Sequence, residues 1–247
     1  MTVPFAGVGV ALVTLFDDDG RPLAGATAEH AAAVVERGVR AVVVAGTTGE
    51  SWKLTGDDRV ELCRAVRDAV DVPVVVGTGN PDQTAAVRMT AAARDAGADA
   101  VLVLSRPGDE DPRPYYEAVR RAACDTPLLA YHFPAVSPPG IAVELLAELP
   151  VDGLKDSSGD ADRLAAELDA FDGALYVGSS AYLALAGPVG ATGAILGLAN
   201  TDPELCARAF EGDAGAQREL LPLHVEMGRD FPAGLKRRVV EAMAAAR

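Results

Sequence analysis

Short apolar runs alternate with amphipathic helical patterns along most of this chain. The apolar runs predict strands near residues Val8–Leu15, Ala41–Ala45, Val72–Gly77, Ala100–Leu104, Leu128–Tyr131, Val151–Lys155, Ala174–Gly178 and Thr192–Leu196. The helical patterns include Ala26–Arg37, Gly56–Val70, Gln83–Ala96 and Ala161–Ala170, the last with Asp160 as its expected N-cap. The strand runs are continuously apolar, which is typical of parallel strands that are covered on both faces.

Eight strands, each followed by a helix, predict an α/β fold of the (β/α)8 TIM-barrel type over about residues 5–212. A doubly wound sheet is the closest alternative, but no Gly-x-Gly-x-x-Gly motif follows the first strand. After a helix near Asp202–Glu211 that would close the barrel, the patterns Ala214–Arg229 and Pro232–Ala246 predict a short C-terminal helical appendix over about 213–247. Because no linker interrupts the chain, residues 1–247 predict one domain.

The composition of the chain limits the partners and the cellular compartments that we expect for this protein. A formal net charge of −14 argues against nucleic acid and anionic membranes as partners, and no apolar run is long enough to span a membrane. Met1–Gly9 lacks the pattern of a signal peptide, and the isolated Cys63, Cys124 and Cys206 indicate reduced thiols, so we expect a cytoplasmic protein. Three scattered histidines make a histidine-based metal site improbable. The C-terminal helices suggest a surface for a homo-oligomer.

Lys155 is the most informative single residue, because it ends the apolar run Val151–Leu154. Burial disfavours the charged form of an amine, and a neutral lysine amine condenses with carbonyl groups to form a Schiff base. The alternative is a lysine that ends a strand and pairs with Asp156 or Asp160. Lys155 alone does not decide between the two interpretations.

The segment Gly46–Ser51 follows the second predicted strand, at the end where barrel enzymes place their active sites. Glycines on both sides of Thr47 and Thr48 allow a tight turn that exposes backbone N–H groups. We expect Gly46, Thr47 and Thr48 to bind a small carboxylate there. An ordinary capped turn between strand and helix is the alternative.

Three further segments place unusual residues at strand ends. Tyr131, before the turn at Pro134, is a candidate proton donor, although a buried core tyrosine is the alternative. His132 faces the opposite side of a regular strand, so we expect a structural role for it. The segments Gly178–Ser180 and Gly190–Ile195 consist of small residues, which let a ligand approach the backbone or let barrel corners pack tightly.

Taken together and in this order, these segments resemble the dihydrodipicolinate synthase/N-acetylneuraminate lyase family of pyruvate-dependent class I aldolases. The resemblance runs over nearly the whole predicted barrel, from about residue 9 to Asn200, and a further match lies in Phe231–Lys236. Its most specific parts are Gly46–Ser51, Tyr131 with Pro134, Gly153–Lys155 and Gly190–Asn200.

The resemblance implies a TIM barrel in which Lys155 forms a Schiff base with pyruvate or another 2-keto acid, with no further cofactor and no metal. It also implies that Tyr131 shuttles protons, that Thr47 orients Tyr131, and that Thr48 binds the keto-acid carboxylate. By the same match, the backbone around Ile195 borders the imine and Gly178 leaves space for the substrate. The second substrate would be an aldehyde.

Two departures bear on the identity of that aldehyde. Synthases that use aspartate semialdehyde usually carry a tyrosine after the fourth strand and an arginine after the Tyr-x-x-Pro segment, and this chain has neither. Arg106 could replace the missing cation at the aldehyde, or it could pair with the acidic residues Asp109, Glu110 and Asp111 in a solvated loop. The leading hypothesis is therefore a Schiff-base aldolase or lyase, with dihydrodipicolinate synthase proper and a non-catalytic keto-acid-binding paralogue as alternatives.

Overall fold

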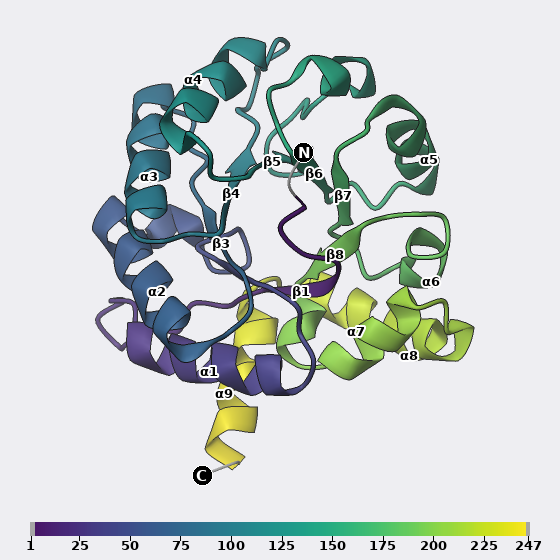
Figure 1. Ribbon diagram of the computed structural model, residues 1–247. Helices are drawn as coiled ribbons and strands as arrows, with labels where there is room; N and C mark the ends of the chain where they lie inside the picture. Colours follow the sequence, from purple (N-terminus) through teal and green to yellow (C-terminus); the bar gives the residue numbers. More distant parts are fainter. Residues whose placement is uncertain (1–2, 246–247) are drawn as a thin grey trace.

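The protein forms a closed barrel of eight parallel strands in its computed structural model, which describes residues 3–245 (Figure 1). The strands are β1 (Gly7–Ala11), β2 (Val42–Val44), β3 (Val74–Gly77), β4 (Ala100–Leu104), β5 (Leu128–His132), β6 (Gly153–Asp156), β7 (Ala174–Val177) and β8 (Gly193–Leu196). Each strand pairs with the next along the chain, and β8 pairs with β1. The predicted (β/α)8 architecture is confirmed.

Helices surround the strands, although not every connection carries a full α-helix. The α-helices are α1 (Ala24–Glu36), α2 (Gly56–Ala69), α3 (Gln83–Asp95), α4 (Arg113–Ala123), α5 (Ala161–Ala170), α6 (Leu183–Ala186), α7 (Pro203–Phe210), α8 (Ala214–Arg229) and α9 (Ala233–Ala245). Shorter 3-10 helices are η1 (Ser51–Lys53), η2 (Val143–Glu148) and η3 (Leu198–Asn200). The expectation of a helix after every strand therefore needs correction at β5, which is followed by η2.

The predicted strand Val8–Leu15 is wrong in its second half, because β1 ends at Ala11. The residues that follow are buried, but side chains rather than a neighbouring strand satisfy their backbone. The N–H of Val13 donates to Asn200 Oδ1 at 3.0 Å, and the N–H of Leu15 donates to Thr27 Oγ1 at 3.1 Å. Burial of both residues against α9 explains the apolar pattern that suggested a longer strand.

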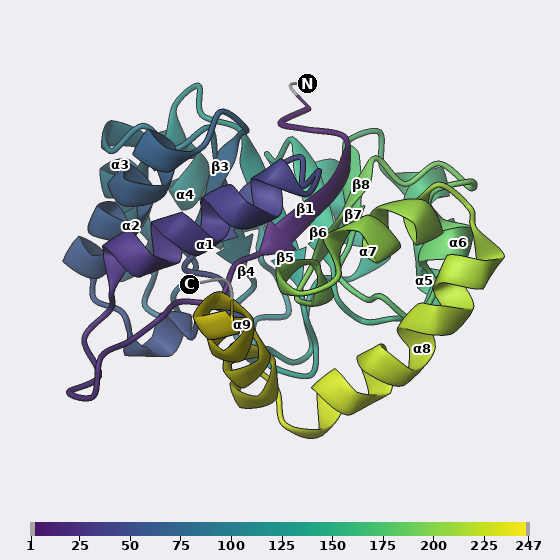
Figure 2. The same cartoon turned by 90° about the horizontal axis from the view of Figure 1, so that it is seen from below.

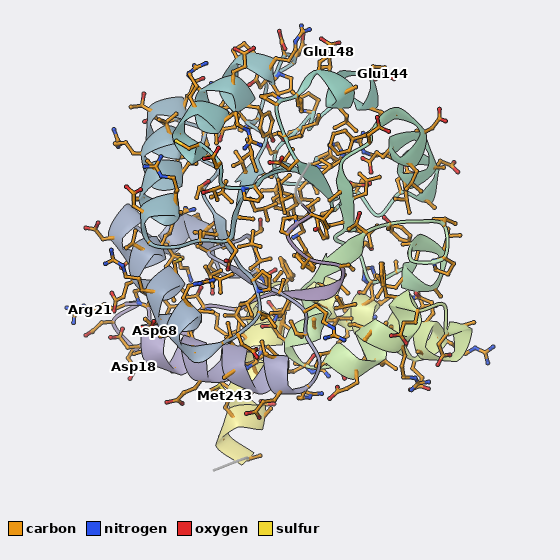
Figure 3. All side chains as sticks on the ribbon, viewed as in Figure 1. Asp18, Arg21, Asp68, Glu144, Glu148 and Met243 are labelled. Atoms are coloured by element: carbon orange, nitrogen blue, oxygen red, sulfur yellow. The ribbon has the colours of Figure 1, made fainter. Side chains whose placement is uncertain are left out.

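The core lies in two shells, as expected for a barrel whose strands alternate their side chains. The interior shell includes Phe5, Val43, Leu102, Leu129, Tyr131, Tyr176 and Ile195. Tyr176 donates its hydroxyl to Phe5 O at 2.7 Å and stacks on the Phe5 ring, which closes the barrel interior beside the N-terminal segment. A larger shell fills the space between strands and helices. Charged side chains lie on the outer surface, among them the labelled Asp18, Arg21, Asp68, Glu144 and Glu148 (Figure 3).

Helices α8 and α9 lie at the end of the barrel opposite the N-terminus (Figure 2). Lys236 of α9 forms an ion pair with Glu50, a residue of the loop after β2 whose side chain is 8% exposed. Lys53 pairs with the same carboxylate, and both ammonium groups lie over the Phe16 ring. This cluster fastens the C-terminal helix to two loops at the same end of the barrel.

Two expectations about the chain as a whole have different outcomes. Within residues 3–245, the protein contains no helix with the length and apolar character needed to cross a bilayer. The division of a single domain into a barrel over 5–212 and an appendix over 213–247 stays a prediction. Residues 1–2 and 246–247 of the predicted domain 1–247 lie outside the described part.

Candidate active site

A cavity of about 460 Å³ opens at the C-terminal ends of the strands. Its lining comes from β1, from the loops after β2 and β5 to β8, and from α8 with the turn that follows it: Ala11, Thr47, Thr48, Tyr131, Phe133, Lys155, Ser157, Ser158, Gly159, Gly178, Ser179, Ser180, Ala181, Ile195, Leu196, Gly197, His224, Met227, Gly228 and Phe231. A cavity of about 520 Å³ lies between α1 and α9, outside the barrel, and contains no lysine. Barrel enzymes work at the C-terminal face, so the cavity that contains Lys155 is the candidate site.

Lys155 projects from β6 into this cavity and is 5% exposed. Strand register aligns it with Tyr131 on β5 and Tyr176 on β7, and the ammonium nitrogen lies 4.4 Å from the centre of the Tyr131 ring. No ion pair within residues 3–245 involves Lys155. The alternative of a pair with Asp156 or Asp160 is therefore not realised.

Asp156 and Asp160 are engaged elsewhere. The N–H and the hydroxyl of Ser158 both donate to the Asp156 carboxylate, each at 2.7 Å. Asp160 caps α5, as expected, by accepting from the N–H groups of Asp162 and Arg163. The ammonium of Lys155 thus faces an aromatic ring and a cavity rather than a carboxylate.

The chain contains three lysines, and their surroundings differ. Lys53 and Lys236 share the Glu50 carboxylate. Neither of them lines the cavity, whereas Lys155 does. Lys155 is consequently the one lysine of this chain that combines burial in the cavity with the lack of a carboxylate partner in the described part.

Tyr131 lies beside Lys155 and is 5% exposed. Its hydroxyl accepts a hydrogen bond from Ser157 Oγ at 3.4 Å, and its ring stacks on Phe133. No hydrogen bond between Thr47 and Tyr131 occurs in residues 3–245, so Ser157 holds the position that the resemblance implied for Thr47. Thr47 does line the same cavity, and its role stays a prediction.

Gly178 lines the cavity as expected, and its role toward the substrate stays a prediction. A Cβ atom at residue 178 would overlap Ser157 Oγ and would lie 2.9 Å from Ser157 Cβ. The lack of a side chain at Gly178 therefore makes room for Ser157, and through Ser157 it affects Tyr131. No pattern in the sequence distinguishes this role of Ser157.

The turn after β2 presents Thr48, which is 5% exposed, to the cavity beside Thr47. The N–H of Glu50 donates to Thr47 O at 3.0 Å, and that of Ser51 donates to Gly46 O at 3.2 Å, which closes the turn. Within residues 3–245, no hydrogen bond engages the N–H groups of Thr47 and Thr48. Two free N–H groups and two hydroxyls form a set of donors that suits a carboxylate.

Gly46 and Arg106 lie outside the lining of the cavity. Gly46 helps to close the turn through its carbonyl, and its contact with a substrate stays a prediction. The Arg106 guanidinium donates to Asp109 Oδ2 at 2.9 and 2.7 Å and lies 5.1 Å above the Tyr115 ring. The charge of Arg106 is thus neutralised within its own loop, as the alternative of a pair with neighbouring acidic residues predicts, and its contact with the aldehyde stays a prediction.

His132 faces away from the cavity, as the strand alternation predicts. Its Nδ1 accepts from the N–H of Ile141 at 2.9 Å, and burial lowers the pKa of His132 to about 4. Its Nε2 lies 4.0 Å from Asp156 Oδ1, and burial raises the pKa of that carboxyl. The side chain is neutral and structural.

Ile195 occupies the expected place, since it lines the cavity from β8 and is 1% exposed. No signal in the sequence marks the residues that α8 contributes to the cavity. His224, Met227 and Phe231 reach the cavity from the C-terminal segment, where a helical apolar pattern is equally typical of simple core packing.

The chain is similar in sequence to a known family and to several named proteins. The sequence profile described as the dihydrodipicolinate synthetase family matches residues 4–230. A protein of Natronomonas pharaonis named 4-hydroxy-tetrahydrodipicolinate synthase is 35% identical over 232 residues, which cover 87% of this chain and 79% of that relative. A Bifidobacterium longum protein of the same name is 35% identical over 234 residues, 89% of this chain and 76% of that relative.

Solved structures give the same result. A dihydrodipicolinate synthase of Bacillus anthracis superposes with a TM-score of 0.88 at 26% identity, over 98% of this chain and 89% of that one. A dihydrodipicolinate synthase of Acinetobacter baumannii, solved in complex with pyruvate, has a TM-score of 0.87 at 25% identity, with the same coverage of both chains.

Proposed function

Because this chain belongs to the dihydrodipicolinate synthetase family, it is a pyruvate-dependent class I aldolase, and we propose that Lys155 is its Schiff-base residue. One observation carries this assignment: Lys155 is buried in the cavity at the C-terminal face, without a carboxylate partner in the described part. The proposed reaction joins a 2-keto acid such as pyruvate to an aldehyde, or cleaves the corresponding product.

In the proposed mechanism, the neutral amine of Lys155 attacks C2 of pyruvate and forms a carbinolamine, which loses water to give a protonated imine. Loss of a proton from C3 produces an enamine, whose carbon attacks the carbonyl carbon of the aldehyde while that oxygen gains a proton. Water then releases the product and restores the amine. The imine acts as the electron sink, so the proposal requires neither a metal nor a further cofactor.

Tyr131 is the proposed proton shuttle, since its ring lies beside the Lys155 nitrogen and its hydroxyl lies in the same cavity. Ser157 donates to that hydroxyl, which leaves the phenolic proton of Tyr131 free to face the substrate. Thr47 and Thr48 are proposed to hold the pyruvate carboxylate through hydroxyls and free N–H groups. Ile195 would border the imine from β8.

Schiff-base trapping tests the assignment of Lys155. Borohydride reduction with pyruvate should add one reduced pyruvate per chain, and peptide mass mapping should place it at Lys155. Lys155→Ala should abolish both the adduct and turnover, because a hydrocarbon side chain cannot form an imine. Lys53→Ala, which removes a lysine outside the cavity, should still give the adduct. An adduct that persists in Lys155→Ala would overturn the assignment.

Tyr131→Phe tests the proton shuttle. The variant should still bind pyruvate, but turnover should fall by about 100-fold or more, the usual contribution of a positioned acid–base group. Rapid-quench trapping should then show slower imine formation with unchanged saturation by pyruvate. An unchanged turnover number would make Tyr131 a core residue instead.

A second candidate is synthesis of 4-hydroxy-tetrahydrodipicolinate itself, which the names of the relatives at 35% identity favour. The engagement of Arg106 with Asp109 weighs against it, because no arginine lines the cavity. Turnover of aspartate semialdehyde would decide between the two. A cytoplasmic location and a homo-oligomeric assembly stay predictions, which fractionation and light scattering can test.

A further inference from the structure

The wall of the cavity that belongs to α8 takes no part in the proposed imine chemistry. It consists of His224, Met227 and Gly228, and Phe231 follows in the next turn. This wall lines the same cavity as Lys155 and the turn at Thr47 and Thr48, so it can contact a second substrate that reacts at the imine. The nature of the wall therefore bears on which aldehyde the enzyme accepts.

Ser180 receives one contact from His224 and one from Gln217, both on α8. The Nδ1 of His224 lies 3.0 Å from Ser180 Oγ, and Ser180 is 2% exposed. One face of α8 supplies a second contact two turns earlier, where Gln217 Nε2 donates to Ser180 O at 2.9 Å. The imidazole thus has a defined position on the cavity wall rather than a free rotamer.

The second nitrogen of His224 is available to a ligand. No hydrogen bond within residues 3–245 engages its Nε2, whereas its Nδ1 is used. Burial lowers the pKa of His224, so the ring is neutral at neutral pH and can donate or accept one hydrogen bond. A neutral imidazole adds no positive charge that could pair with a carboxylate, whereas it can bond to an alcohol hydroxyl in either tautomer.

The charged side chains of the cavity lining also favour an uncharged second substrate. No Asp, Glu or Arg side chain is among the residues that line the cavity, and Lys155 is its one cation. Imine formation with pyruvate uses that lysine, and Thr47 and Thr48 are committed to the pyruvate carboxylate. An anionic aldehyde would then place an unpaired charge in the cavity of a protein whose net charge is −14.

We propose that His224 and Ser180 form the recognition site for the second substrate, and that this substrate is an uncharged aldehyde that bears a hydroxyl group. The hydroxyl bonds to His224 Nε2, and the carbon skeleton packs on Met227 and Phe231. This inference rests on the proposed function, because it presupposes the imine at Lys155. His224 selects the substrate and is not assigned a proton-transfer step.

The test compares three aldehydes with pyruvate as the constant partner: glyceraldehyde, propanal, which lacks both hydroxyls of glyceraldehyde, and the anion glyoxylate. The wild-type protein should prefer glyceraldehyde over propanal by about tenfold or more in kcat/KM, the usual effect of one specific hydrogen bond. Glyoxylate should be the poorest substrate. In His224→Leu, the KM for glyceraldehyde should rise about tenfold while propanal is unaffected.

Matched variants keep the outcomes distinct. Val225→Ala changes an exposed residue of the same helix and should leave the preference intact. His224→Gln, which keeps a side-chain donor, should retain part of the preference, and Ser180→Ala should weaken it. Circular dichroism confirms that each variant is folded.

Two different failures can be told apart. If wild-type protein forms no borohydride-stable adduct with pyruvate, the proposed function is wrong. If the adduct forms but glyoxylate is preferred, or if folded His224→Leu and Ser180→Ala both keep the wild-type preference for glyceraldehyde, the recognition site is wrong and the aldolase assignment stands.

Discussion

Gly178→Ala should damage both stability and turnover, because Gly178 makes room for Ser157. The new methyl carbon would overlap Ser157 Oγ, lie 2.9 Å from Ser157 Cβ and lie 3.1 Å from Asp156 O. Overpacking of this kind typically costs about 1–3 kcal/mol of unfolding free energy. The least costly relief is rotation of the Ser157 hydroxyl, which breaks its hydrogen bond to Tyr131.

The effect on turnover follows from that hydrogen bond. A neutral hydrogen bond contributes about 1 kcal/mol net, and 1.36 kcal/mol corresponds to a tenfold change in rate. We therefore expect the kcat of Gly178→Ala to fall about fivefold, with the imine at Lys155 still trapped by borohydride. Ser157→Ala should show a similar loss of kcat with little loss of stability, since it removes the hydroxyl without a clash.

Urea denaturation and steady-state kinetics on a double-mutant cycle measure this coupling. Gly178→Ala combined with Ser157→Gly should recover stability relative to the sum of the single changes, because both clashing atoms of Ser157 are gone. Gly25→Ala is the matched control, since a Cβ at that position of α1 meets nothing within 4 Å. Additive losses in the cycle would refute the argument that Gly178 acts through Ser157.

Two further predictions concern buried charges. Lys236→Met should lower the unfolding free energy by about 2 kcal/mol, because it leaves the buried Glu50 carboxylate with one cation. Lys53→Met changes a half-exposed partner of the same carboxylate, so it should cost less than about 1 kcal/mol in the same urea titration. Burial, reinforced by the charge of Asp156, raises the pKa of Glu167 to about 8. Between about pH 5 and pH 8 the folded protein therefore binds more protons than the unfolded chain, and the free energy of unfolding falls as pH rises. Glu167→Gln should flatten that fall in urea titrations across this range, and an unchanged slope would contradict it.

The strands could be predicted because burial leaves a local mark on the sequence. The bounds of β4, α5 and α8 match their apolar patterns residue for residue. Hydrophobicity reports burial rather than backbone pairing, however, which explains the error after Ala11. Val13 and Leu15 are as apolar as strand residues, yet their N–H groups bond to side chains that come from distant parts of the chain.

The same limit applies to the candidate site. Lys155, Tyr131, Thr47 and Thr48 follow strands, so the barrel topology alone brings them to one face. The ion pair of Lys236 with Glu50 joins residues far apart in sequence, and no local pattern distinguishes such a pair from two solvated charges. Arg106 shows the converse, since a cation near the mouth of the barrel can be consumed by a neighbour three residues away.

Strand residues and α8 residues of the cavity differ in how freely they can be substituted when the enzyme changes its substrate. Parallel register fixes Tyr131 beside Lys155, and any shift of that register would disturb the whole barrel. His224 and Met227 instead lie on α8, which packs on the core through Ala216 and Leu220 and contacts the barrel mouth through polar groups, such as Gln217 with Ser180, so its cavity-facing residues belong to no strand pairing. Substitutions on the inner face of α8 can therefore alter which aldehyde binds while the imine chemistry persists. Variants of α8 should accordingly separate the two activities, with pyruvate trapping constant across a series in which aldehyde preference changes.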